Sequence, residues 1–233
     1  LALDPDQRAR FENQSELEQL TSNNLLNKEG DDHRRLRALV SKAFTPRVVA
    51  DLRSRIQAIA DDLLDQMSAN SEIDLVESYA FPLPIIVIAE LLGIPAADRE
   101  RFRVWSDNFV TPTLTPEEQE RSGQLMQEFV SYLGGLFEQR RQNPQPDLVT
   151  ALLQAESEGE RLSTAELYSM VILLIVAGHE TTVSLIGNAS VALLKHPEAL
   201  GHLKRHPEEM AQAVEELLRY DPPVERAVTR WVA

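Results

Sequence analysis

Hydrophobic residues recur every three or four positions along most of this chain, which is the spacing of amphipathic α-helices. The clearest case follows Thr45 and Pro46, a residue pair typical of a helix start. The apolar positions then follow at helical spacing: Leu52, Ile56, Ile59, Leu63 and Met67. Only residues 227–232 alternate as a strand would. The pattern predicts a mainly α fold with minimal β structure.

Proline, glycine and capping residues divide the rest of the chain into further helices. These predicted helices cover residues 82–92, 96–109, 116–142, 147–155 and 163–195, with two more that start at Pro197 and Pro207. We find no internal repeat and no glycine-serine linker. A length of 233 residues allows one large domain or two small ones.

The segment 163–195 predicts one long central helix, because Ser163 and Glu166 have the spacing of a capping box. Residues 170–176 are hydrophobic on nearly all sides, as in a helix buried in the middle of a domain. This unbroken apolar run is much shorter than the roughly 20 residues that a bilayer requires, so no membrane span is expected.

Small and polar residues then occupy positions where a core helix would carry Leu or Val. They form the sequence Ala177-Gly178-His179-Glu180-Thr181-Thr182. A glycine leaves space, and an acid and a hydroxyl lie beside it, so this segment is the main candidate for a binding site.

A purely structural explanation of the same segment stays open. The helix could bend at Gly178, and the hydroxyls of Thr181 and Thr182 could donate to carbonyls one turn earlier, as buried threonines in helices often do. A zinc-protease site is excluded, because His179-Glu180 would need a second histidine where Val183 stands.

Charge and composition limit the function classes. The net charge of −14 argues against nucleic acid and against an anionic membrane surface as partners. The chain has no Cys and hence no disulfide, which is compatible with a reducing cytosol. We therefore expect a cytoplasmic globular protein.

Two further residue pairs have helical spacing. His33 and Arg37 lie four residues apart, so on a helix they could bind one anion together, or they could belong to a solvated basic face. Glu216 and Arg219 lie three apart, which fits a partly buried ion pair as well as an ordinary surface pair.

Taken in order, these motifs resemble a bacterial soluble cytochrome P450. They are His33-x-x-x-Arg37, Ala177 to Thr182, Glu216-x-x-Arg219, Asp221-Pro222-Pro223-Val224 and finally Arg230. The resemblance covers nearly the whole chain from Asp31 onward. It implies a cytochrome P450-like helical fold with the long central helix over haem b. It also implies a monooxygenase that inserts one oxygen atom from O2 into a small organic substrate.

The resemblance also implies residue roles. Three positions match side chains that bind the haem propionates: His33, Arg37 and Arg230. The planar guanidinium groups among them suit a carboxylate, since two parallel hydrogen bonds can form. Ala177 and Gly178 match the small pair that lets the central helix pass close over the haem.

The remaining roles concern proton delivery and stability. Glu180 and Thr181 match the acid and alcohol that deliver protons to bound dioxygen. Glu216 and Arg219 match a structural ion pair.

One departure from the family is serious. The family's haem iron is bound by a Cys thiolate, which favours O–O cleavage, and this chain contains no Cys. We therefore expect one cytochrome P450-like domain over residues 1–233 that is incomplete at both ends and inactive as it stands, with no metal ligand of its own. A non-enzymatic helical binding or interaction domain derived from the same scaffold is the alternative.

A basic segment is the candidate surface for an electron donor. Between His33 and Ala50 there is no acidic residue, and the basic ones besides Arg37 are Arg34, Arg35, Lys42 and Arg47. If Arg37 turns toward the haem, the other four can face solvent. A positive patch on an acidic protein would orient a ferredoxin- or flavodoxin-type donor, although a solvated face without a partner explains it equally well.

Overall fold

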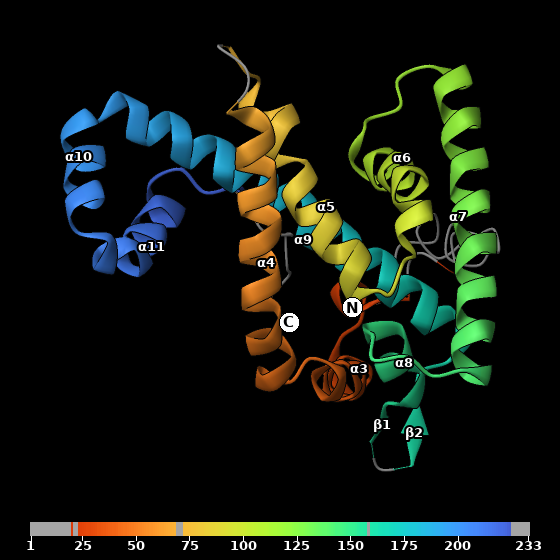
Figure 1. Ribbon diagram of the computed structural model, residues 1–233. Helices are drawn as coiled ribbons and strands as arrows, with labels where there is room; N and C mark the ends of the chain where they lie inside the picture. The colour runs from red at the N-terminus through yellow and green to blue at the C-terminus, as the bar shows by residue number, and fades with distance from the viewer. Residues whose placement is uncertain (1–19, 21–22, 69–71, 158, 225–233) are drawn as a thin grey trace.

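The structure is a computed structural model that describes residues 20, 23–68, 72–157 and 159–224, and it consists almost entirely of helices (Figure 1). This confirms the predicted mainly α fold. The elements in chain order are η1 (Leu25–Asn27), α3 (Gly30–Ala43), α4 (Pro46–Met67), the π-helix η2 (Val76–Ala80), α5 (Pro82–Leu91), η3 (Ala96–Asp98), α6 (Arg99–Val110), α7 (Pro116–Gln142), α8 (Leu148–Gln154), β1 (Glu156–Ser157), β2 (Glu160–Arg161), α9 (Thr164–Lys195), α10 (Pro197–Arg205), η4 (Pro207–Glu209) and α11 (Met210–Tyr220).

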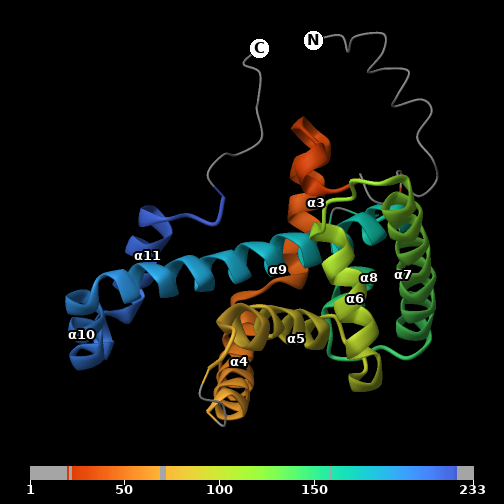
Figure 2. The same cartoon turned by 90° about the horizontal axis from the view of Figure 1, so that it is seen from above.

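The helix α9 is the axis of the structure, and Figure 2 shows it running from α7 and α8 at one end to α10 and α11 at the other. Its start is fixed by the predicted capping box. The Ser163 hydroxyl accepts from the Glu166 amide at 3.3 Å, and the Glu166 carboxylate accepts from the Ser163 amide at 2.8 Å. Proline at position 197 begins α10 directly beyond it.

Other helix starts also follow the capping residues. The side chain of Thr45 accepts from the Val48 amide at 3.3 Å at the start of α4, and Thr115 forms a second capping box with Glu118 at the start of α7. The predicted helix 96–109 is interrupted, because a 3-10 turn precedes α6. The π-helix η2 and the two-residue hairpin β1–β2 were not predicted, and the predicted strand 227–232 lies outside the described residues.

The hydrophobic core lies where α5, α6, α7 and α8 surround the first half of α9. Aromatic side chains from α6 and α7 dominate it: Phe102, Trp105, Phe129 and Phe137 are all buried. From α9, the side chains of Met170, Val171 and Ile175 are buried in the same cluster. The second half of α9 is less covered, since α10 and α11 bury none of their described residues completely.

Among the described helices, α9 alone is long and apolar enough to cross a membrane on length and composition, with an 18-residue window of mean hydropathy 1.8. From its unbroken apolar run, α9 was expected to be too short for a span, whereas the mean hydropathy over 18 residues does not exclude one. A core helix of a soluble protein passes the same test, and 28% of this window is buried inside the structure. Within the described part of the chain, α9 packs against α5, α6 and η2.

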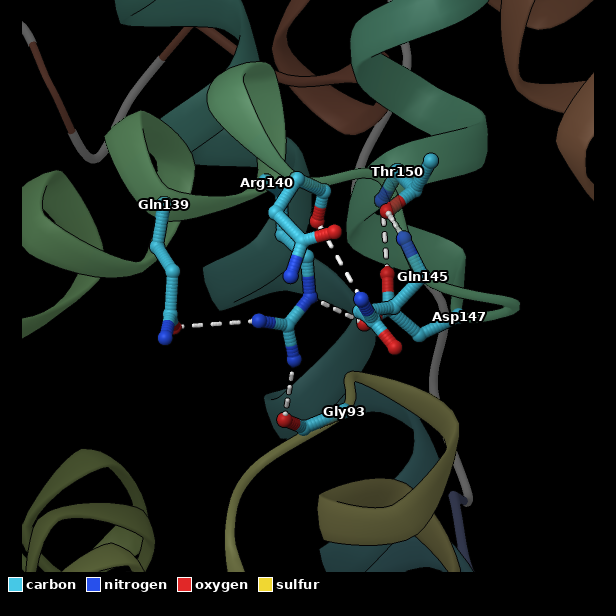
Figure 3. Close-up of polar contacts among 7 residues, drawn as sticks. Gly93, Gln139, Arg140, Gln145, Asp147 and Thr150 are labelled. Carbon is cyan, nitrogen blue, oxygen red and sulfur yellow. Dashed lines mark hydrogen bonds and ion pairs between the residues drawn. The ribbon is translucent and has the colours of Figure 1, made fainter.

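A buried ion pair joins three elements beside this core (Figure 3). Arg140 of α7 is 9% exposed and Asp147 is 5% exposed, and the Arg140 Nε donates to the carboxylate. The same guanidinium donates to the Gly93 carbonyl at 2.7 Å and to the Gln139 side-chain oxygen at 3.1 Å. The second carboxylate oxygen of Asp147 accepts from the Thr150 amide at 2.8 Å and so caps α8. The pair therefore fixes the end of α5, the end of α7 and the start of α8 together.

We predict that Arg140→Ala lowers the free energy of unfolding by about 3–5 kcal/mol, because it leaves the Asp147 carboxylate buried without its cation. Denaturant unfolding followed by circular dichroism measures this loss. The neighbouring variant Arg141→Ala is the control, since Arg141 forms only an exposed pair with Glu138 at 3.4 Å and should change stability little. Equal stability of the two variants would contradict a structural role for the Arg140–Asp147 pair.

Candidate functional site

The candidate site is the segment of α9 from Ala177 to Thr182, and its two threonines bond to the helix itself. The Thr181 hydroxyl donates to the Ala177 carbonyl at 2.6 Å, and the Thr182 hydroxyl donates to the Gly178 carbonyl at 2.8 Å. These are the hydrogen bonds to carbonyls one turn earlier that the purely structural explanation of this segment predicts. A hydroxyl that donates its proton still has lone pairs that can accept a hydrogen bond. These bonds therefore fix the direction of each hydroxyl without excluding a further partner.

The two sides of α9 differ at this segment. Ala177 is exposed and Thr181, one turn further, is partly exposed, and residues four apart lie on the same side of a helix. Glu180 is exposed as well, whereas His179 is buried. We call Ala177, Glu180 and Thr181 the open strip of α9. It consists of a methyl group, a carboxylate and a hydroxyl.

Gly178 has a neighbour that the sequence did not predict. A Cβ atom built on Gly178 would lie 3.1 Å from the Ile88 Cδ1 atom, which is closer than ordinary van der Waals contact. The absent side chain therefore points at α5, and the glycine allows α5 to pack closely on α9. The resemblance implied that Gly178, together with Ala177, lets α9 pass close over the haem. In the described structure it lies on the packed side of the helix.

His179 is the most unusual polar residue of the segment. Its side chain is 1% exposed, its ring meets the Phe81 ring edge to face at 4.5 Å, and neither ring nitrogen has a hydrogen-bond partner among the described residues. Burial lowers the pKa of His179, and the nearby Asp107 carboxylate opposes this shift only in part. The imidazole is therefore a neutral core group between α9, η2 and α6. From the sequence, His179 was considered only as a zinc ligand, and its burial was not predicted.

Helix α3 carries the predicted anion-binding pair, His33 and Arg37. Leu36 and Leu39 are buried, while His33 is partly exposed and Arg37 is exposed. Within the described part of the chain, Arg37 forms no hydrogen bond or ion pair, so its guanidinium is available to an anion. No hydrogen bond or ion pair joins either residue to the open strip.

The predicted basic patch on α3 is smaller than expected. Arg35 is only 25% exposed, because its guanidinium bonds to the Glu166 carboxylate and lies 3.2 Å from that of Glu160. These contacts raise the pKa of Arg35, mainly through the hydrogen bond that Arg35 donates to Glu166. Arg34 pairs with Asp31 at the surface of α3. The prediction that Arg35 faces solvent is therefore wrong, since the fold brings distant acidic residues to a segment that has none of its own.

Of the other predicted basic residues, the structure describes the side chain of Lys42 alone. Lys42 is exposed on the last turn of α3. The side chain of Arg47 lies outside the described residues, as does Arg230.

The Glu216–Arg219 pair of α11 is present as a two-point contact. The Arg219 Nε and Nη2 atoms donate to the two carboxylate oxygens of Glu216 at 2.7 and 2.5 Å. Both side chains are exposed, so of the two forms considered from the sequence this is the surface one. The hydrogen bond from Arg219 lowers the pKa of the Glu216 carboxyl.

Comparison with known proteins identifies the family. Residues 98–232 match the family model for Cytochrome P450. A cytochrome P450 of Bacillus subtilis (strain 168) is 51% identical over 216 residues, which cover 93% of this chain and 53% of that protein. The solved structure of the bacillaene polyketide synthase cytochrome P450 PksS of Bacillus subtilis 168 matches with a TM-score of 0.83 at 45% identity, over 89% of this chain and 53% of that one.

A third match is the crystal structure of myxobacterial cytochrome P450 CYP267B1 in complex with myristic acid. Its TM-score is 0.81 at 44% identity, and the match covers 93% of this chain and 54% of that chain. The chain thus spans about half the length of the relatives that it matches. The family model covers more than half of this chain and the helical architecture agrees with solved members, so the chain belongs to the cytochrome P450 family.

Proposed function

We propose that the complete protein is a haem-dependent monooxygenase that inserts one oxygen atom from O2 into a small organic substrate, with electrons from a separate redox protein. The observation that carries this proposal is the open strip of α9. It combines a small side chain, a hydroxyl with a fixed direction and an exposed carboxylate in one helical turn. A bound haem supplies the redox chemistry that activates O2.

The residues of this chain fit parts of haem b. A flat apolar ring needs a helix face without bulky side chains, and Ala177 and Thr181 offer one. Its propionates need cations, and Arg37 has no partner among the described residues while His33 lies one turn before it on α3. In this proposal Arg230 is a third propionate partner. The chain has no Cys, so the thiolate ligand would come from outside these 233 residues.

Glu180 and Thr181 would divide the task of proton delivery. The Thr181 Oγ1 atom donates to the Ala177 carbonyl, so its lone pairs can hold a water molecule beside the substrate site. The Glu180 carboxylate is exposed and can exchange protons with solvent. The hydroxyl would position the proton donor, and the carboxylate would resupply it.

The proposal includes a cytoplasmic location and no nucleic-acid partner. The absence of Cys suits a reducing compartment, and the charge of −14 would repel a polyanion. The exposed ion pair of Glu216 and Arg219 on α11 would have a structural role.

Fewer basic side chains of α3 face solvent than the sequence predicted, so the proposed docking surface for the electron donor is smaller. Arg35 is engaged by Glu166, so Arg34 and Lys42 are the basic side chains of α3, besides Arg37, that remain at the surface. The pairing of Arg34 with Asp31 is exposed on both sides and therefore weak. An acidic ferredoxin-type donor could therefore displace Asp31 from Arg34.

We predict that Thr181→Ala in the complete protein keeps substrate binding but diverts electrons from product to hydrogen peroxide, because the water that delivers protons is no longer held. The measurement is the ratio of product formed to electrons consumed, which should fall several-fold. Thr182→Ala is the matched control, since Thr182 makes the same type of hydrogen bond to Gly178 on the packed side. Similar ratios in both variants would remove Thr181 from the proposed role.

The variant Glu180→Gln should instead slow turnover.

A second prediction concerns electron transfer. Arg34→Glu combined with Lys42→Glu should slow the first electron from an acidic ferredoxin-type donor at low ionic strength, and the loss should shrink at high salt. Stopped-flow reduction of the haem measures this rate. Lys204→Glu with Arg205→Glu makes the same charge change on α10, at the far end of α9, and should leave the rate near that of the unmodified protein (Figure 2). Equal rates in the two double variants would exclude the α3 surface.

A further inference from the structure

Four metal-binding side chains gather where α10 ends and η4 begins, at the opposite end of α9 from α3. His202 and His206 come from α10 and its C-terminal cap, and Glu208 and Glu209 come from η4. We propose that this cluster binds a divalent transition metal ion, with Zn²⁺ as the probe that tests it.

The geometry brings the ligand atoms to one place. The Nε2 atom of His202 lies 2.9 Å from a Glu209 carboxylate oxygen, and the Nδ1 atom of His206 lies 3.2 Å from one of Glu208. One ligand atom each of His206, Glu208 and Glu209 lies within 4.8 Å of the others. Four ligands about 2.0–2.1 Å from a tetrahedral zinc ion would be about 3.4 Å apart. These side chains are about half exposed, so small rotations can produce that spacing.

The two imidazoles distinguish this cluster from a group of surface carboxylates. His202 lies on the last turn of α10 and His206 is its C-terminal cap, and their ring centroids are 4.6 Å apart. Neutral imidazole is a preferred ligand of zinc, copper and nickel, whereas calcium and magnesium prefer oxygen alone. The ligand set therefore selects a transition metal.

The charge of the cluster also favours a cation. Two carboxylates, Glu208 and Glu209, lie side by side in it. Among the described residues, the ion pairs of Glu208 and Glu209 are with His206 and His202 and with no Lys or Arg. A bound ion would replace these contacts and join the end of α10 to the turn that begins α11. The metal should thus stabilise this end of the protein.

The experiment is a Zn²⁺ titration by isothermal calorimetry, on purified protein without a polyhistidine tag and treated with chelator beforehand. One zinc ion should bind per chain, and the melting temperature should rise with zinc concentration. His206→Asn and His202→Asn should each raise the dissociation constant about tenfold or more, since even supporting residues of metal sites cost that much. The thermal stabilisation should be lost with the affinity.

His196→Asn is the matched control. His196 is equally exposed and lies 3.7 Å from Glu198, but it belongs to no group of three metal-binding side chains in the described structure. Its loss should leave zinc affinity unchanged. Should a histidine variant fail to fold by circular dichroism, Glu209→Gln keeps the side-chain size and should still weaken binding. Absence of zinc binding to the unmodified protein, or unchanged affinity in the Glu209→Gln variant, would overturn the proposal.

Discussion

The close packing of α5 on α9 at Gly178 is the contact on which the candidate site depends. A helix as apolar as α9 could be covered on every side, but here one side is held against Ile88 and Phe81 while Ala177 and Thr181 stay open. Glycine favours this close approach, since a Cβ atom at position 178 would lie only 3.1 Å from the Ile88 Cδ1 atom. Because an α-helix turns by 100° per residue, Ala177 and Thr181 point about 100° and about 60° away from Gly178, in the same rotational sense. They therefore lie together on the flank of α9 beside the side that packs on α5, and this flank stays open.

This arrangement reconciles the two explanations of the polar segment. The back-bonded hydroxyls of Thr181 and Thr182 are what a helix needs to satisfy polar groups near its core, and they would exist without any ligand. The same hydrogen bond fixes the direction in which the partly exposed Thr181 hydroxyl donates, and its lone pairs can still accept a hydrogen bond. The hydrogen bond from Thr181 to Ala177 therefore satisfies a polar group of the helix and also serves the proposed chemistry. His179, on the packed side, is a neutral core residue whose burial lowers its pKa.

Local signals in the sequence were sufficient for most of the fold. The bounds of α9 follow from the capping box at Ser163 and from Pro197, and the start of α4 follows from Thr45. Contacts between distant segments could not be predicted this way. Arg35 was expected in solvent, yet it pairs with Glu166, 131 residues further along the chain. That Ile88 is the neighbour of Gly178 could not be predicted for the same reason, since which side chain fills the space beside a glycine depends on how helices pack.

The open strip of α9 should face the haem in the complete protein, while Gly178 faces α5. A crystal structure of the complete protein with haem bound measures this arrangement. We expect Ala177 and Thr181 against the haem plane, the Arg37 guanidinium on a propionate, and Gly178 still in contact with Ile88. A haem that lies on the Gly178 side of α9, or one whose propionates do not meet Arg37, would contradict the account.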